Sequence, residues 1–281
     1  MFDAISLSRS APPPLQRAIG EIRIAVRNRD GRSVLSVLHQ QGSAKARLPA
    51  VASDRAPEVV LLNTAGGLAS GDRFSYEIAA GDDTSVTVTT AACERVYRSL
   101  GDVPAGVETR LEAGPCATLE WLPQETILFD RAAIRRRLSV DMAADSTVLI
   151  AESVILGRAA HGETVDYGSF RDDWRLRRAG RLVFAEATRL EGPIAAIRGR
   201  KAVLDHGTGF ATLLLAGASA ASRLDPLRAL LSDEANAGAS LRDGVLLVRI
   251  VAADGMALRR LLVPAISILR GGVALPRVWQ C

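Results

Sequence analysis

Most of this sequence consists of short runs in which apolar and polar residues alternate, and this pattern limits the fold more than any other feature. The runs are separated by Gly, Asp and Asn, residues that favour turns. Alternation with a period of two is typical of strands with one buried face. From about residue 20 to 215 the pattern therefore predicts a mainly β body. The expected strands are "EIRIAV", "SVLSVL", "PEVVLL", "RFSYEI", "SVTVTT", "ATLEWL", "STVLIAESVIL", "GRLVFAEATRL" and "KAVLDH".

The C-terminal third combines helices with a strand. In "LDPLRALLSDEANAG", leucines recur at helical spacing, and we expect Asp225 to cap the helix with Pro226 in its first turn. In "MALRRLLVPAISILRGG", a second leucine stripe predicts a helix with a kink at Pro264 and an end at Gly271. Between them, "GVLLVRIVAADG" predicts a strand that closes on an Asp-Gly turn.

The length of 281 residues and the mean hydropathy of +0.14 allow a sizeable core. We expect one domain over residues 1–281, with residues 1–19, which include "APPP", as a leader before the first strand. Sequence similarity does not recur at any period of roughly 20 to 50 residues. This absence argues against a conventional propeller or solenoid.

The cellular location is expected to be the cytoplasm. No apolar run reaches the roughly 20 residues that cross a bilayer, and "MFDAISLSRSAPPP" lacks the features of a signal peptide. Cys93, Cys116 and Cys281 are odd in number and form no CxxC pair, which agrees with a reducing compartment. We expect two core thiols and one thiol in the C-terminal tail.

The glycine-rich stretch "LLNTAGGLASGD" raises the question of phosphate binding. Gly66 and Gly71 have the spacing of a P-loop, but Asp72 and Arg73 stand where Lys and Ser or Thr are needed. The dinucleotide motif requires a helix next, whereas "RFSYEI" is strand-like. The stretch instead predicts a turn with positive φ at one or more glycines.

Other common kinds of site are also disfavoured. The three histidines, His39, His161 and His206, lie far apart, which argues against a zinc site. No G-x-S-x-G elbow is present. The arginines cluster at residues 135–137 and 175–178, but aromatic residues make up only 4% of the chain. Basic clusters without interleaved aromatics favour a solvated surface over nucleic-acid binding.

Four carboxylates stand beside apolar β segments and are the strongest candidates for a role. They are Asp72, Glu125, Glu152 and Glu163. Burying a carboxylate is costly unless it is paired, hydrogen-bonded or protonated. One interpretation is that they pair with arginines such as Arg95 and Arg158. The other is a chain of oxygen ligands along a polar interior path, able to bind a divalent ion weakly and release it.

Four blocks of the sequence resemble, in order and spacing, the UreD family of urease accessory proteins, also called UreH. They are "NTAGGLASGD" (63–72), "TVTTAACERVYRS" (87–99), "LEWLPQETILFDRA" (119–132) and "ILGRAAHGE" (155–163). Weaker similarity extends from "GEIRIAV" near the N-terminus to "LPRVWQ" at the end. The resemblance therefore covers nearly the whole chain.

The resemblance implies a role that is not enzymatic. Members of the family help to insert nickel into urease: they bind the urease apoprotein and the accessory protein UreF, which recruits the GTPase UreG. The implied fold is a many-stranded, β-helix-like superhelix with two helices in the C-terminal third. No tightly bound cofactor is implied. Nickel is expected in transit through an interior tunnel, with Asp72 and Glu163 as the first candidates for its polar wall, and Glu125 and Glu152 next.

Two other functions stay open on the residues alone. The chain could be a β-rich, hydrolase-like enzyme that uses the scattered carboxylates as acid and base, although paired catalytic motifs are missing. It could also be a β-rich interaction protein without a metal role, in which the acids form ion pairs at the surface.

Overall fold

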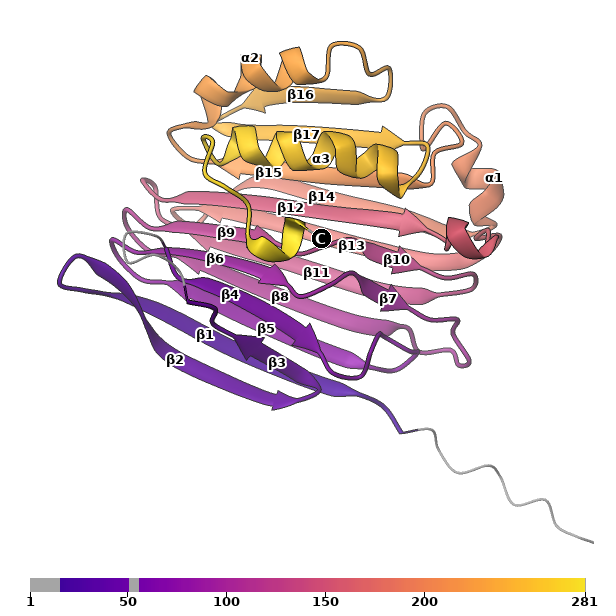
Figure 1. Cartoon of the computed structure of the whole chain (residues 1–281), viewed down its shortest axis with the longest axis horizontal. Coiled ribbons are helices and arrows are strands. Elements are labelled where there is room, and N and C mark those ends of the chain that lie inside the picture. Colours follow the sequence, from indigo (N-terminus) through magenta and orange to yellow (C-terminus); the bar gives the residue numbers. More distant parts are fainter. Residues whose placement is uncertain (1–15, 51–55, 281) are drawn as a thin grey trace, which may run out of the picture.

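The computed structural model describes residues 16–50 and 56–280, and it consists of two large β-sheets packed face to face with helices at one end (Figure 1). The first strand begins at Ile19, close to the predicted start of the folded region. Residues 1–15, which contain "APPP", lie outside the described residues, as does Cys281.

The two sheets contain seven and ten strands. In the order in which they lie side by side, the strands of the seven-stranded sheet are β14 (Arg181–Gly192), β13 (Gly168–Arg178), β11 (Ala133–Met142), β8 (Ala105–Ala113), β5 (Arg73–Ala80), β1 (Ile19–Arg29) and β2 (Arg32–Gly42). Those of the ten-stranded sheet are β16 (Ala237–Arg242), β17 (Val245–Ala252), β15 (Gly209–Ala216), β12 (Thr147–Leu156), β9 (Thr118–Leu122), β6 (Ser85–Thr90), β4 (Glu58–Asn63) and β3 (Ala44–Arg47), with β10 (Thr126–Leu128) and β7 (Glu94–Val96) beside them.

From β4 to β13 the chain winds back and forth between the two sheets, so that successive coils stack. Strands of successive coils pair in parallel, and paired residues are 29 to 36 positions apart in the sequence. The mainly β, superhelical fold is thus confirmed, but the argument against a solenoid from the missing sequence period was wrong. Coils of unequal length blur a period that the backbone nevertheless follows.

The connections between coils differ sharply at the two ends of the strands. At one end they are turns of four residues, at 81–84, 114–117 and 143–146. At the other end they are long, at 64–72, 91–104, 123–132 and 157–167. We call this the long-loop end. Its loops also stack, because β7 pairs with β10 and β10 pairs with β12, both in parallel.

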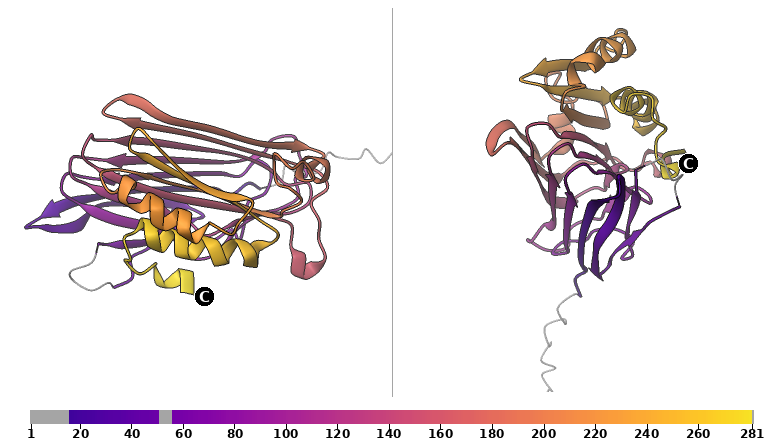
Figure 2. Two further views of the ribbon diagram at one scale, coloured as in Figure 1. Left: turned by 90° about the horizontal axis from the view of Figure 1, so that it is seen from above. Right: turned by 90° about the vertical axis from the view of Figure 1, so that its left-hand side faces the viewer.

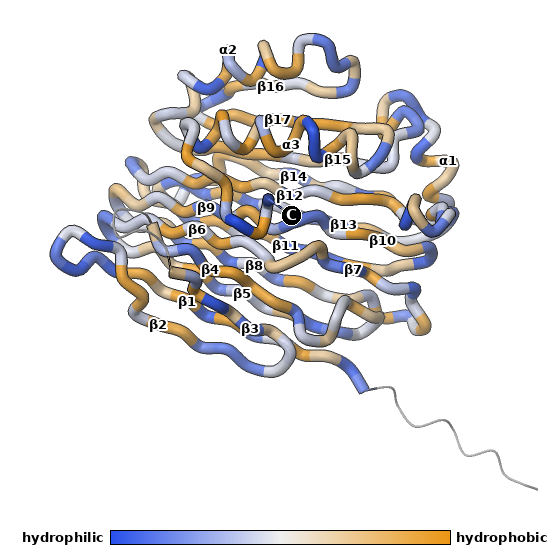
Figure 3. Tube along the Cα trace, viewed as in Figure 1, coloured by the Kyte–Doolittle hydropathy of each residue, from blue (hydrophilic) through white to orange (hydrophobic). Residues whose placement is uncertain are grey.

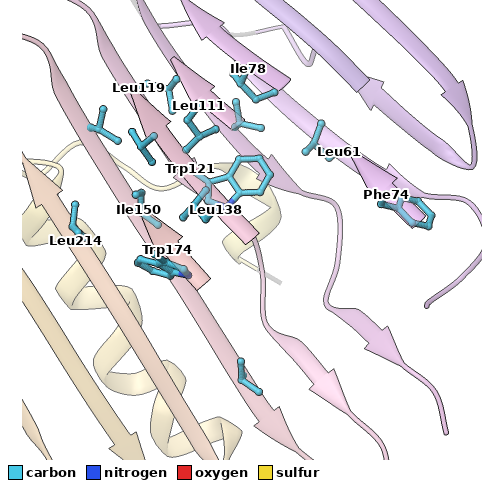
Figure 4. Close-up of a cluster of buried hydrophobic side chains, with 14 of the residues drawn as sticks. Leu61, Phe74, Ile78, Leu111, Leu119, Trp121, Leu138, Ile150, Trp174 and Leu214 are labelled. Atoms are coloured by element: carbon cyan, nitrogen blue, oxygen red, sulfur yellow. The ribbon is translucent and has the colours of Figure 1, made fainter. Parts of the chain in front are cut away.

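The main core fills the space between the sheets. Apolar and polar residues alternate along many of the strands (Figure 3), and the buried apolar side chains form this core. Figure 4 shows the resulting cluster, in which Leu111 and Trp174 of the seven-stranded sheet face Trp121 and Ile150 of the ten-stranded sheet. Burial of these side chains holds the two sheets together.

A second core lies between the ten-stranded sheet and the helices α2 (Ala220–Leu230) and α3 (Gly255–Leu269), which cover β15 to β17 (Figure 2). The predicted start of α2 was wrong: Ser219 is its N-cap position, and Pro226 lies inside the helix. The extra turns bury Ala220 together with Leu227, which explains the earlier start.

Helix α3 follows the prediction, with Pro264 inside it and Gly271 after its end at a φ of 73°. The predicted Asp-Gly turn after β17 was wrong, because Asp254 caps α3 by accepting a hydrogen bond from the N–H of Ala257 at 2.8 Å. Among residues 16–50 and 56–280, no helix is long and apolar enough to span a membrane.

Other local predictions also failed. "KAVLDH" forms turns rather than a strand, because Asp205 and His206 adopt positive φ angles that interrupt an extended backbone. A short helix, α1 (Ile194–Arg198), precedes it and was not predicted. Strands β11 and β13 were missed because their arginines obscure the alternation.

Candidate functional site

A cavity of about 60 Å³, with both apolar and charged side chains in its wall, lies between the two sheets, beside the long-loop end. Both sheets and the stacked loops contribute to its wall. Its polar and charged lining residues are Tyr76, Thr90, Glu94, Thr109, Trp121, Gln124, Thr126, Arg136, Arg137, Glu152 and Asp172. The volume is enough for a few water molecules or a partly hydrated ion.

Strand alternation explains how charged groups reach this interior position. In β11, Arg136 shares the inward face with Ile134 and Leu138, while Arg135 and Arg137 point to solvent. In β13, Asp172 likewise alternates with the buried Phe170 and Trp174. The parallel register places Arg136 directly beside Asp172.

The guanidinium of Arg136 bridges carboxylates from both sheets. Its Nη1 donates a hydrogen bond to Oε2 of Glu152 at 2.7 Å, and its Nη2 donates to Oδ2 of Asp172. The other oxygen of Glu152 accepts a hydrogen bond from Nε1 of Trp121 at 2.7 Å. Burial alone would lower the pKa of Arg136, but the two carboxylates raise it. The guanidinium therefore stays charged.

Glu94 is a second carboxylate in the wall, near the charge of Arg95. Both of its oxygens accept hydrogen bonds from Nδ2 of Asn63 at 3.2 Å. Burial raises the pKa of Glu94 to about 7, and the nearby charge of Asp72 adds to the shift. Burial likewise raises the pKa of Tyr76. Glu94 thus titrates near neutral pH.

Asp72 sits at the edge of this region with both oxygens engaged. Oδ1 accepts the backbone N–H of Ala18 at 2.8 Å, and Oδ2 accepts that of Ala69 at 2.7 Å. The residue is only 4% exposed. These bonds tie the loop before β5 to the segment that enters β1. The glycines of the loop adopt positive φ as predicted, and a Cβ at Gly67 would lie 2.8 Å from the carbonyl oxygen of Arg95 in the neighbouring loop.

Glu125 belongs to a clamp on the C-terminal segment. Its Oε1 lies 2.9 Å from Nη1 of Arg259 in α3, and its Oε2 accepts a hydrogen bond from the thiol of Cys93 at 3.3 Å. Arg259 also donates to the backbone oxygen of Trp279 at 2.7 Å. Burial, reinforced by Glu125, raises the pKa of Cys93 to about 11, so this thiol stays protonated. The other predicted core thiol, Cys116, is exposed instead.

Glu163 lies in the last long loop and pairs with Arg158 through two contacts, at 2.9 and 3.2 Å. These hydrogen bonds lower the pKa of Glu163. The guanidinium of Arg158 also stacks 4.0 Å above the ring of Phe129. The predicted pairing of an acid with Arg158 is therefore confirmed, whereas Glu152 and Glu125 pair with arginines that the sequence reasoning did not select.

Of the four predicted acids, Glu152 lines the cavity and Asp72 lies near it, while Glu125 and Glu163 lie elsewhere at the long-loop end. The sequence reasoning missed Arg136, Asp172 and Glu94. Arg136 was assigned to a solvated face, and that was wrong for this one arginine of residues 135–137. The alternation along β11, which places Arg136 on the same face as its apolar neighbours, could have predicted that this arginine is buried. Within residues 16–50 and 56–280, no three His, Cys, Asp or Glu side chains are grouped so that they could hold a metal ion.

Comparison with known proteins identifies the family. The family model described as "UreD urease accessory protein" matches residues 18–280. The chain belongs to the UreD family of urease accessory proteins. Similar proteins named urease accessory protein UreD occur in Rhizobium etli (50% identity; 94% of this chain and 96% of the relative), Agrobacterium fabrum (47%; 96% and 93%) and Mesorhizobium japonicum (43%; 99% and 100%). This UreD-family chain is an accessory protein, not an enzyme.

The four sequence blocks that resemble the UreD family all lie at the long-loop end. Each block begins at or within a strand of the ten-stranded sheet and continues into the long connection that follows it. The blocks contribute Asp72, Glu94, Glu125 and Glu163, together with Trp121 beside the cavity. The most recognisable parts of the sequence therefore gather at one end of the fold.

Replacing Asp72 tests whether its carboxylate holds the loop. Because two backbone N–H groups lose a charged acceptor, we expect Asp72→Ala to lower the free energy of unfolding by about 2 to 4 kcal/mol. Asp72→Asn keeps one acceptor and should lose less. Urea denaturation measures both effects, and an Asp72→Ala variant as stable as the wild type would show that these bonds do not hold the loop.

Glu94 should make stability depend on pH in a defined window. A carboxyl whose pKa rises from 4.5 to about 7 on folding binds its proton more tightly in the folded state, so stability falls as pH rises through this range. We expect Glu94→Gln to be more stable than the wild type by up to about 3 kcal/mol at pH 8, with little difference near pH 4. Thermal melts across this range measure the difference, and equal curves for both proteins at pH 8 would contradict the assignment.

Proposed function

We propose that this chain is a scaffold that binds the urease apoprotein and the accessory protein UreF, through which the GTPase UreG is recruited. In this proposal it acts in the cytoplasm, and nickel passes through its interior on the way to the urease active site. Membership of the UreD family supports the assignment to urease maturation. The observation that carries the nickel path is the cavity between the two sheets, which has three carboxylates in its wall.

The composition of the cavity suits an ion that must move on. Carboxylate and carbonyl oxygens bind nickel less strongly than imidazole and thiolate do. The wall offers Glu94, Glu152 and Asp172, while the thiol of Cys93, outside the wall, stays protonated and donates a hydrogen bond to Glu125. Ligands of this kind would guide a divalent cation without retaining it.

The four acids chosen from the sequence enter the proposal in different ways. Glu152 is part of the cavity wall, and Asp72 contributes negative charge near Glu94. Glu125 and Glu163 stay predictions as outer points of the path, each with an arginine partner that nickel would have to compete with. Binding of nickel by the isolated chain is not required.

Urease maturation in cells that lack this gene tests the proposal. The cells are complemented with the wild type, with a Glu94→Gln and Glu152→Gln double variant, or with Glu112→Gln as a control on an exposed outer position of β8. We expect the double variant to capture the urease apoprotein and UreF normally but to lower the nickel content of urease several-fold. The control should match the wild type in both readouts.

The two parts of the proposal fail separately. Full nickel loading of urease with the double variant would refute the nickel path, but the scaffold role would still stand. If the purified wild-type chain captures neither the urease apoprotein nor UreF, the scaffold role is refuted. The nickel content of urease is measured by metal analysis, and capture is measured by pull-down of the purified proteins.

A further inference from the structure

The guanidinium of Arg136 lies between two carboxylates inside the protein. Glu152 comes from the ten-stranded sheet and Asp172 from the seven-stranded sheet, and the guanidinium contacts one oxygen of each. All three side chains are almost completely buried, with 8 to 13% of each exposed. The interior thus already contains a cation of its own.

We propose that Arg136 is a resident counter-ion that prevents Glu152 and Asp172 from trapping a divalent cation in the cavity. The inference rests on the proposed function and adds a regulating residue to the path. Arg136 in this account binds no metal. It sets how tightly the two carboxylates beside it can hold one.

The argument follows from charge and from the number of available oxygens. Two ionised carboxylates facing each other in a buried, low-dielectric space would attract a divalent cation strongly. With Arg136 between them, Oε2 of Glu152 and Oδ2 of Asp172 already accept hydrogen bonds from a permanent positive charge. A passing ion then meets a net charge of about −1 at this group, rather than −2.

The position of the guanidinium is fixed by further contacts. Nη1 also donates a hydrogen bond to Oγ1 of Thr126 at 3.2 Å, from the stacked loop strand β10. The ring of Phe170 lies 5.1 Å from the guanidinium carbon, close enough for a cation–π contact. A side chain held from both sheets and from the loops remains in place when the cavity holds no other ion.

The test is nickel binding by the purified full-length chain, without urease or other proteins. We expect Arg136→Met to gain one Ni²⁺ site per chain, with at least about tenfold tighter binding than the wild type in equilibrium dialysis. The gain should disappear when Asp172→Asn is added to Arg136→Met. The matched control is Arg135→Met, which removes the neighbouring arginine from the solvent side of the same strand, outside the cavity wall, and should leave binding unchanged.

Loss of a buried ion-pair partner can unfold a protein, so folding is followed in the same titration. If Arg136→Met is unfolded without metal, we expect Ni²⁺ to refold it, and to fail to do so once Asp172→Asn is added. The proposal is overturned if folded Arg136→Met binds Ni²⁺ no more tightly than the wild type. It is also overturned if the gained site survives Asp172→Asn, or if the unfolded variant stays unfolded at saturating Ni²⁺. None of these results depends on urease, so the proposed function is judged separately.

Discussion

Parallel pairing of successive coils in register is the constraint on which the other features depend. Because strands of one sheet stack with their inward positions aligned, a polar residue at an inward position meets its equivalent in the next coil. The register places Arg136 of β11 beside Asp172 of β13 in this way. The same stacking aligns the long connections at one end, so that loops far apart in the sequence form a single layer.

Charged groups inside such a fold need hydrogen-bond or ion-pair partners. The buried carboxylates have different partners, and these partners indicate different roles. Asp72 accepts two backbone N–H groups, and Glu125 is locked to Arg259 in the clamp on the C-terminus. These two acids stabilise the connections between parts of the fold. Glu94 instead depends on an amide donor and titrates near neutral pH, while Glu152 shares its arginine with Asp172. The acids in the cavity wall thus have an amide partner in the case of Glu94 and one shared arginine in the case of Glu152 and Asp172.

The sequence predicted eight of the strands of the β body, the two C-terminal helices and the acids near the long loops, because alternation and short motifs record local structure. It could not show the coils, since their lengths differ and the repeat lies in the backbone register. Arg136 was assigned to the surface because a run of three arginines suggests solvent exposure. The same run read with a period of two places its middle residue inside. Which inward charges face one another across the two sheets depends on sheet packing, which no local pattern encodes.

The central claim is that the cavity between the sheets is the passage for nickel. The most direct measurement is the rate of nickel transfer to urease, in the purified assembly with its accessory proteins, when the cavity is filled without changing its charge. Thr109→Met places a larger side chain in the wall, and Ser139→Met adds the same side chain on the outer face of the same sheet. The account predicts that Thr109→Met assembles normally but slows transfer several-fold, while Ser139→Met does not. Transfer at the wild-type rate by a folded, assembled Thr109→Met protein would contradict it.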